Sequence, residues 1–298
     1  MTTTTPFHRL ARTDRHRWWR PLLGSLLIII GLPVALAGLF GAAAAVVHAV
    51  DGPADFLTAG PLAELVVTTV VLGMLTPLCL LAAAWVQRRP AGTLSSVAGR
   101  LRWGRLGRFL LLAAPVVALM TGVTMLLPGE NTTFVAFDGS QLALGLAVVL
   151  LLVPLQAAGE EYLFRGWILQ SFGAWFASPW PGIVVSSLLF GLAHGIGSAW
   201  LLADVIVFGL LTAVLTVRTG GLEAAIALHV ANNVAGFGLA LATGTLDDTG
   251  TPSATVALVS MASMTLYTLT VLFVTTPKTR TRLRSRLADG IDFLIAAL

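Results

Sequence analysis

The stretch QLALGLAVVLLLVPLQAAGEEYLFRGWILQSF, residues 141–172, is long and apolar enough to cross a membrane, yet it carries three charged residues. A transmembrane helix needs about 20 predominantly apolar residues to cross the hydrocarbon core of a bilayer. The charges are those of Glu160, Glu161 and Arg165. Because charge inside a membrane is costly, ionisable residues there are functional candidates by default. The stretch predicts a membrane helix, and it is too long for a simple span. We therefore expect its C-terminal part to bend or to continue beyond the membrane core.

Apolar runs of the same kind recur along all 298 residues, of which 56% are hydrophobic and 11% charged, with a mean hydropathy of +0.88. A soluble domain carries about 25% charged residues. Since unpaired backbone groups are penalised in lipid, such runs are predicted to be helices. We expect a polytopic, all-α integral membrane protein whose residues 1–298 form a single transmembrane domain of about eight helices. The predicted spans are residues 21–48, 60–86, 109–127, 141–172, 180–196, 199–217, 221–243 and 253–276.

Basic residues are concentrated on one side of the predicted membrane. Sixteen of the 18 Lys and Arg residues lie in the segments 9–20, 88–108 and 278–286, which fall on the same side if there are eight spans. The opposite loops carry only acidic charge, from Asp51, Asp55, Glu130, Asp138, Asp247 and Asp248. Cytoplasmic loops are enriched in Lys and Arg. The pattern predicts a multi-pass protein of the cell membrane with both termini in the cytoplasm.

The high isoelectric point, about 10.2, has the same origin. Basic clusters next to membrane spans face anionic lipid, so membrane lipids are the expected partners and nucleic acid is not. Arg9 to Arg20 precede an apolar run that is too long for a signal peptide, so we expect a retained anchor. Residues 87–108 are predicted to be a cytoplasmic linker, which contains either an interfacial amphipathic piece or simply a positively charged topology anchor. The single cysteine, Cys79, excludes a disulfide framework.

Further polar residues inside the predicted spans cluster between positions 156 and 233. His194 stands near the end of the fifth span, within FGLAHG. His229, Asn232 and Asn233 stand in the seventh, within ALHVANN. The remaining acids of this region are Asp204 and Glu223. Spans four to seven are therefore the candidate working core.

Helix geometry separates the roles of the two adjacent glutamates. With successive side chains about 100° apart, Arg165 lies about 40° from Glu161 and about 140° from Glu160. Arg165 is therefore predicted to pair with Glu161, as residues four apart on a helix do. Glu160 is left on another face, free for a different role.

A free glutamate, two histidines and an amide from different helices could converge on one buried point. A carboxylate beside histidines suits general-base activation of water, and histidine and asparagine suit hydrogen bonding to a developing oxyanion. Together they suit the attack of water on a carbonyl group. Spacing alone leaves a proton or ion pathway open, and it also allows histidine and asparagine to act as contacts between helices.

In this order and on successive spans, the three patterns Glu160-Glu161-x-x-x-Arg165, Phe190-x-x-x-His194 and His229-x-x-x-Asn233 resemble the signature of the CPBP family. Its members are intramembrane endopeptidases, also called type II CAAX prenyl proteases or the Abi family. The resemblance covers about residues 140–240, the expected catalytic core. It implies that Glu160 and His194 activate a water, that His229 and Asn233 stabilise the oxyanion, and that Glu161 and Arg165 support them.

The resemblance leaves the metal question open, because members of the family have often been labelled metalloproteases. Glu160, His194, His229 and Asn233 could ligate a divalent ion such as zinc. The H-E-x-x-H pattern of zincins is absent, and the glutamate has a role without metal. We therefore expect no cofactor and a glutamate-dependent mechanism.

The sequence thus predicts a hydrolase that cleaves a peptide bond of a membrane-associated peptide or protein. The alternatives are a proton- or ion-coupled transporter and a catalytically silent scaffold or immunity protein of the same fold. Transporters often show inverted repeats with broken helices in both halves. Here the polar residues fall in one block, which counts against that alternative.

Overall fold

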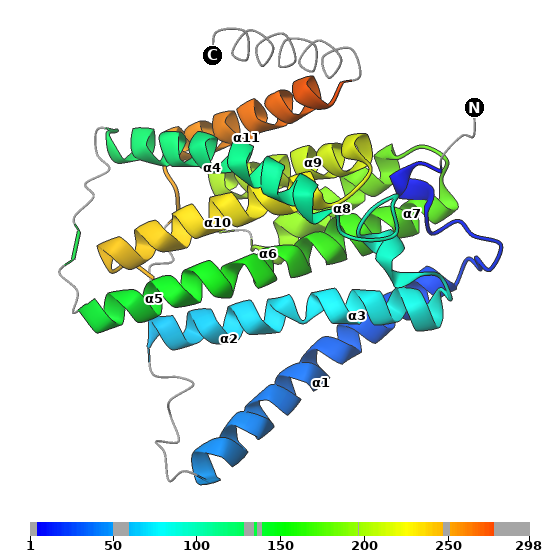
Figure 1. Cartoon of the computed structure of the whole chain (residues 1–298), viewed down its shortest axis with the longest axis horizontal. Coiled ribbons are helices and arrows are strands. Elements are labelled where there is room, and N and C mark those ends of the chain that lie inside the picture. Colours follow the sequence, from blue (N-terminus) through cyan, green and yellow to red (C-terminus); the bar gives the residue numbers. More distant parts are fainter. Residues whose placement is uncertain are drawn as a thin grey trace, which may run out of the picture.

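The regular elements of the computed structural model are helices that run side by side in one bundle (Figure 1). The structure describes residues 5–49, 60–127, 134–135, 139–195, 197–246 and 251–276. In chain order the elements are η1 (Phe7–Arg9), α1 (Arg20–Ala49), α2 (Pro61–Gly73), α3 (Leu75–Leu81), η3 (Ala82–Val86), η4 (Ala91–Leu94), α4 (Trp103–Met125), α5 (Gly139–Leu151), α6 (Val153–Glu161), η5 (Tyr162–Ile168), α7 (Leu169–Trp175), α8 (Trp180–Ala193), α9 (Ala199–Thr219), α10 (Glu223–Thr243) and α11 (Ala254–Thr275).

Seven stretches of helix in these ranges are long and apolar enough to cross a membrane, and α8 is a shorter apolar helix. This confirms the prediction of a polytopic helical membrane protein. The spans lie within a few residues of their predicted bounds, with two exceptions. The acidic loop residues Asp51, Asp55, Glu130, Asp138, Asp247 and Asp248 and the basic segment 278–286 lie outside the described residues.

The first exception is α4, which begins at Trp103 and not at residue 109. Residues 103–108, which we had assigned to a cytoplasmic linker, are its first turns. Leu106 is buried in the hydrophobic core, whereas Trp103 is exposed. The prediction was wrong because the four arginines between positions 100 and 108 are typical of a solvated segment. In the structure Arg105 and Arg108 lie on the helix itself, which buries Leu106 on another face.

The second exception is α8, which ends at Ala193 and not at residue 196. Its 14 residues give a length of about 21 Å, against about 30 Å for a bilayer core. His194 is its C-cap, and Gly195 follows with φ of +86°, a left-handed conformation that glycine adopts without strain. The short helix therefore ends before a full crossing of the bilayer core, and His194, whose side chain is exposed, follows directly.

The long fourth span is a chain of α5, α6, η5 and α7, drawn in green in Figure 1. A turn at Leu152 precedes Pro154, and residues Tyr162–Ile168 form a π-helix directly after Glu161. Short π-helical segments occur frequently at functional sites. Before the glutamates, Gly159 lets α6 approach α2 closely, because a Cβ there would lie 2.1 Å from the carbonyl oxygen of Leu72. The span thus runs from Leu142 to Trp175 as one long helical stretch, with a turn at Leu152 and a π-helix that begins directly after Glu161.

The basic segments meet at one end of the bundle. Arg9 Nη1 donates to the carbonyl oxygen of Gly173 at 2.9 Å, which joins the N-terminal segment to the end of α7. Gln170 Nε2 donates to the carbonyl oxygen of Thr93 at 2.9 Å, which joins α7 to the segment between α3 and α4. The N-terminal arginines, this segment and the end of α7 thus lie on the same side, as the charge pattern predicted.

A buried ion pair closes the same end. Arg102 donates from its backbone N and from Nε to Glu223 Oε1, at 2.9 and 2.8 Å, and from Nη2 to Glu223 Oε2 at 2.6 Å. Arg102 Nη2 also donates to the carbonyl oxygen of Thr219 at 3.3 Å. The pair joins the start of α4, the end of α9 and the start of α10. Glu223, which the sequence left without a role, therefore holds this end of the fold together.

Candidate active site

Polar side chains of α6 and α10 contact one another inside the bundle, and an exposed histidine at the end of α8 lines a cavity beside them. Glu160 and Glu161 close α6, His194 caps α8, and His229 lies six residues into α10. Glu160 and His229 are buried, with 6% and 2% of their surfaces exposed. The contacts of Glu160 and Glu161 with His229 thus join α6 to α10, while His194 of α8 lines the same cavity as His229.

Glu161 is the centre of the supporting part of this group. Its Oε1 accepts a hydrogen bond from Arg165 Nη1 at 2.9 Å. The Nδ1 of His229 lies 2.8 Å from the same oxygen. All three side chains are buried. The predicted pairing of Arg165 with Glu161 is therefore present. The contact with His229 is new, and it ties the fourth span to α10.

Arg165 is held by aromatic rings as much as by its carboxylate. Its guanidinium carbon lies 4.3 Å from the ring centre of Phe190 and 5.8 Å from that of Phe208. Its Nε and Nη2 are buried without hydrogen-bond partners. A cation over an aromatic face is attracted by the ring quadrupole, and more strongly when it is desolvated. The phenylalanine of the F-x-x-x-H pattern thus contributes to holding the arginine of the first pattern.

The sequence predicts that Glu160 does not pair with Arg165, and the structure shows no such pair among the residues it describes. Glu160 has other partners instead. Its Oε2 accepts a hydrogen bond from Gln156 Nε2 at 2.6 Å and lies 3.2 Å from His229 Nε2. Its side chain keeps 8% of its surface exposed, whereas that of Glu161 has none. The helix geometry could not reveal these contacts, because they depend on how α10 packs against α6.

Gln156 is the residue that the sequence reasoning missed. Besides its bond to Glu160, its Oε1 accepts a hydrogen bond from Asn233 Nδ2 at 3.0 Å. One glutamine therefore links the candidate base to the candidate oxyanion donor on another helix. A signal was available, since Gln156 lies four residues before Glu160 and so on the same helix face, in a run that is otherwise apolar.

His194 makes a local hydrogen bond that determines which of its ring nitrogens carries the proton. Its Nδ1 lies 2.8 Å from the carbonyl oxygen of Phe190, and its ring centre is 4.5 Å from that of Phe190. A carbonyl oxygen only accepts hydrogen bonds, so Nδ1 carries the proton and Nε2 is the nitrogen with a lone pair when the ring is neutral. His194 can therefore accept a proton or a hydrogen bond at Nε2.

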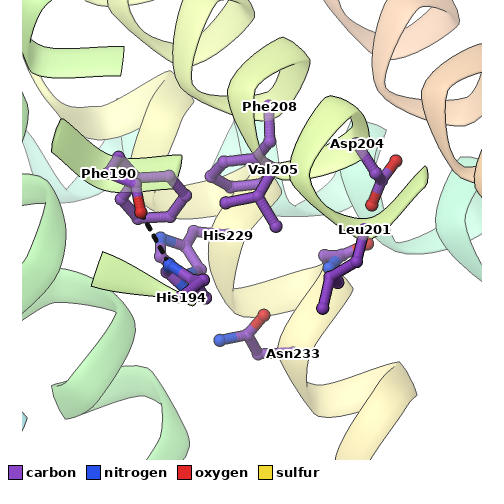
Figure 2. A pocket seen from close by; sticks show the side chains of 9 residues that line it. Phe190, His194, Leu201, Asp204, Val205, Phe208, His229 and Asn233 are labelled. Atoms are coloured by element: carbon purple, nitrogen blue, oxygen red, sulfur yellow. Dashed lines mark hydrogen bonds between the residues drawn. The ribbon is translucent and has the colours of Figure 1, made fainter. Parts of the chain in front are cut away.

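A cavity of about 200 Å³ adjoins this group (Figure 2). His194, His229 and Asn233 line it, together with Asn232 and Asp204. Glu160 does not belong to its lining, but it contacts His229, which does. A single water needs about 10–15 Å³ of cavity volume, so this cavity is larger than one water requires. The structure thus brings His194, His229 and Asn233 to one cavity and places Glu160 directly behind His229.

The residues present do not form a ready set of metal ligands. Both ring nitrogens of His229 are directed at carboxylates, which leaves it no nitrogen for a metal. Among the residues described, no group of three or more His, Cys, Asp or Glu side chains is placed to hold a metal ion. The proposed chemistry of this site therefore uses the side chains of the protein alone.

Comparison with known proteins bears on the motifs directly. Residues 141–235 match the family model described as type II CAAX prenyl endopeptidase Rce1-like. The resemblance inferred from the three patterns is confirmed. This Rce1-like segment contains all seven residues of the three patterns, from Glu160 to Asn233. At the level of the family, the match supports a CAAX-protease-like intramembrane endopeptidase, that is, a hydrolase.

Two curated relatives resemble the chain more broadly. The uncharacterized protein YyaK of Bacillus subtilis is 26% identical over 180 residues, which are 58% of this chain and 60% of that protein. An uncharacterized 24.3 kDa protein of Escherichia coli is 33% identical over 120 residues, 39% of this chain and 54% of that protein. The chain thus spans a little over half the length of these relatives. No solved structure matches it.

Proposed function

We propose that this protein cleaves peptide bonds of membrane-associated peptides or proteins, with water activated by Glu160 as the attacking group. The observation that supports the proposal most is the connected set of contacts beside the cavity. It runs from Asn233 through Gln156, Glu160 and His229 to Glu161. A transporter or a scaffold would not require a candidate base and an oxyanion donor to be tied to each other.

Glu160 is the proposed general base. A base must lie within hydrogen-bond reach of the proton that it abstracts, directly or through one water. Its Oε2 is engaged by Gln156 and His229, which fixes the carboxylate, and its partly exposed side chain leaves room for a water. His194, whose Nε2 is the free acceptor, would hold that water from the other side. The proton released when water attacks the carbonyl carbon passes to the Glu160 carboxylate and from there to the leaving amine.

Asn233 is the proposed oxyanion donor. His229 was expected to share this role, but both of its ring nitrogens are directed at Glu160 and Glu161, which leaves it no N–H for an oxyanion. The amide nitrogen of an asparagine carries two hydrogens, and that of Asn233 uses one on Gln156. The second is available to an oxygen that develops negative charge inside the cavity. Donors that are already oriented cost no reorganisation when the charge forms, which is why such groups are worth more in a buried site than in water.

The Glu161–Arg165 pair is proposed to position these groups. Glu161 holds His229 at Nδ1 and thereby fixes the direction in which Nε2 points. Arg165 balances the charge of Glu161 and is itself packed against Phe190, the residue that bonds His194. The first pattern of the family thus orients the histidines of the other two.

We further propose that the protein lies in the cell membrane with both termini in the cytoplasm and takes its substrate from the bilayer or the cytoplasmic side. This rests on the arginines that meet at one end of the bundle and on the positive-inside rule. A cysteine introduced at Thr5 or Arg100 is expected to resist a membrane-impermeant thiol reagent in intact cells. Labelling of either cysteine from outside the cell would show that the proposed orientation is wrong.

The function can be tested with the purified protein in liposomes. A mixture of synthetic membrane-spanning peptides is added, and the products are identified by mass spectrometry in water enriched in oxygen-18. We expect pairs of fragments whose masses sum to one peptide plus one water, with the heavy oxygen in the new carboxylate. The same preparation of Glu160→Gln should give none. Transport of a solute in the absence of any cleavage would favour the carrier alternative.

A further inference from the structure

Asp204 is a third carboxylate beside the site, and the family motifs do not include it. It lies on the face of α9 formed by Leu201, Asp204, Val205 and Phe208, all of which line the cavity. In Figure 2 it stands across the cavity from Phe190 and His194. The same cavity therefore has the candidate catalytic groups on one side and an acidic side chain on the other.

The carboxylate of Asp204 is incompletely satisfied. Its Oδ2 accepts a hydrogen bond from Ser260 Oγ of α11 at 3.2 Å, while Oδ1 is buried without a hydrogen-bond partner. An ionised carboxylate offers about four acceptor positions on its two oxygens. In the part of the chain that the structure describes, no Arg, Lys or His forms an ion pair with it. A charge within a membrane span is normally paired, and a cationic group that enters the cavity would supply such a partner.

The cavity can accommodate such a partner. Its volume of about 200 Å³ is more than ten times the roughly 10–15 Å³ that one water requires. Space remains for part of a substrate next to the attacking water. A group that reaches Asp204 would lie in the same cavity as a carbonyl held by Asn233, and thus close to the bond that is cut.

We propose that Asp204 determines substrate specificity by binding a cationic side chain, a lysine ammonium or an arginine guanidinium, beside the scissile peptide bond. The inference rests on the proposed peptidase function. Cationic donors form the shorter and stronger hydrogen bonds with carboxylates, so a partner of opposite charge would satisfy Oδ1. Neutral and acidic side chains at the same position would leave the carboxylate unpaired or repel it.

The main alternative is that Asp204 serves only as a contact between α9 and α11 through Ser260. Such a contact needs a hydrogen-bond acceptor and no charge. Asparagine provides an acceptor of the same shape, so a purely structural Asp204 could be replaced by asparagine with no change in which peptides are cut. The two roles are therefore distinguished by the substrate selectivity of the Asp204→Asn variant and not by its stability.

The test uses the liposome assay with a peptide library in which the residues near the middle of an apolar span are varied among Lys, Arg, Gln, Met and Glu. The peptides are acetylated, so that side chains provide their only cations. For the wild-type chain we expect cleavage next to Lys or Arg to be preferred over Gln. In Asp204→Asn the ratio of kcat/KM for Lys over Gln should fall roughly tenfold to a hundredfold, the range expected for one charged hydrogen bond.

Ser260→Ala is the matched control, since it removes the partner of Asp204 but keeps the carboxylate. It should retain the preference for basic residues. The same preference in wild type and Asp204→Asn, or no basic preference in the wild type, would overturn the inference and leave the peptidase proposal intact. Absence of cleavage by the wild-type chain would overturn both.

Discussion

Two buried carboxylate–arginine pairs in this molecule differ in how completely they are satisfied. In the pair at the end of the bundle, both oxygens of Glu223 accept hydrogen bonds from Arg102, which keeps 16% of its side chain exposed. In the pair at the candidate site, neither Glu161 nor Arg165 has any side-chain exposure, and Glu161 Oε2 and two nitrogens of Arg165 lack partners.

The difference indicates what each pair is for. A pair selected for stability alone would be expected to satisfy its donors and acceptors, as the Arg102–Glu223 pair does. The Glu161–Arg165 pair instead shares its carboxylate with His229 and stacks its guanidinium on Phe190. Buried pairs often add little net stability, yet removing one partner is strongly destabilising. The site pair is therefore best explained by the position that it imposes on His229.

Removal of Arg165 should have the largest effect on stability. In Arg165→Ala, Glu161 is left buried with only a histidine, and breaking such a pair costs about 3–5 kcal/mol. We expect a sharp fall in the monodisperse yield after detergent extraction and in the thermal unfolding temperature. Arg165→Lys keeps the charge but loses the planar contact with Phe190, so its yield and unfolding temperature should lie between those of the wild type and Arg165→Ala. A stable and fully active Arg165→Ala protein would contradict the role given to the pair.

Removal of Asn233 should leave the fold intact and slow the reaction. Asn233→Ala takes away a hydrogen-bond donor that is proposed to act only as the oxyanion forms, and such a loss typically costs about 10²–10³ in kcat. The neighbouring Asn232→Ala is the matched control, since Asn232 lines the same cavity but has no proposed role in the reaction. Equal losses in the two variants, measured in the liposome assay, would show that Asn233 has no special function.

Removal of Arg102 should have a smaller effect, and on stability alone. Arg102→Ala exposes a carboxylate at the end of the bundle, where water can partly replace the arginine, so we expect a loss of roughly 1–3 kcal/mol. The folded fraction should retain the specific activity of the wild type. Thermal unfolding combined with activity per folded molecule checks both points. A loss of specific activity equal to that of Arg165→Ala would remove the distinction between the two pairs.

Removal of divalent metal should have no effect. Both nitrogens of His229 face carboxylates, and the mechanism assigns proton transfer to Glu160 without an ion. Dialysis against a chelator is therefore expected to leave the cleavage rate unchanged. Loss of activity that is restored by zinc, with stoichiometric metal in the active protein, would require Glu160, His194 and His229 to be reassigned as ligands.

The comparison also shows what the sequence can predict. Apolar runs and residues four apart on a helix gave the spans and the Glu161–Arg165 pair, because both depend on local geometry. The contacts of Gln156 with Glu160 and Asn233 could not be predicted in the same way, since they depend on the packing of α10 against α6. The end of α8 at Ala193 and the start of α4 at Trp103 were missed for a related reason. In both places the bundle, and not the local composition, decides where the helix stops or begins.

The central claim is that two adjacent carboxylates have different functions, and a matched pair of variants tests it most directly. Glu160→Gln and Glu161→Gln make the same chemical change at neighbouring positions, and kcat and folded yield are measured for both in liposomes. The account predicts that Glu160→Gln folds as well as the wild type and loses about 10²–10⁴ in rate, the usual contribution of a general base. It predicts that Glu161→Gln loses folded yield, because Arg165 is left buried without its counter-charge. Turnover by Glu160→Gln at the wild-type rate would contradict the account.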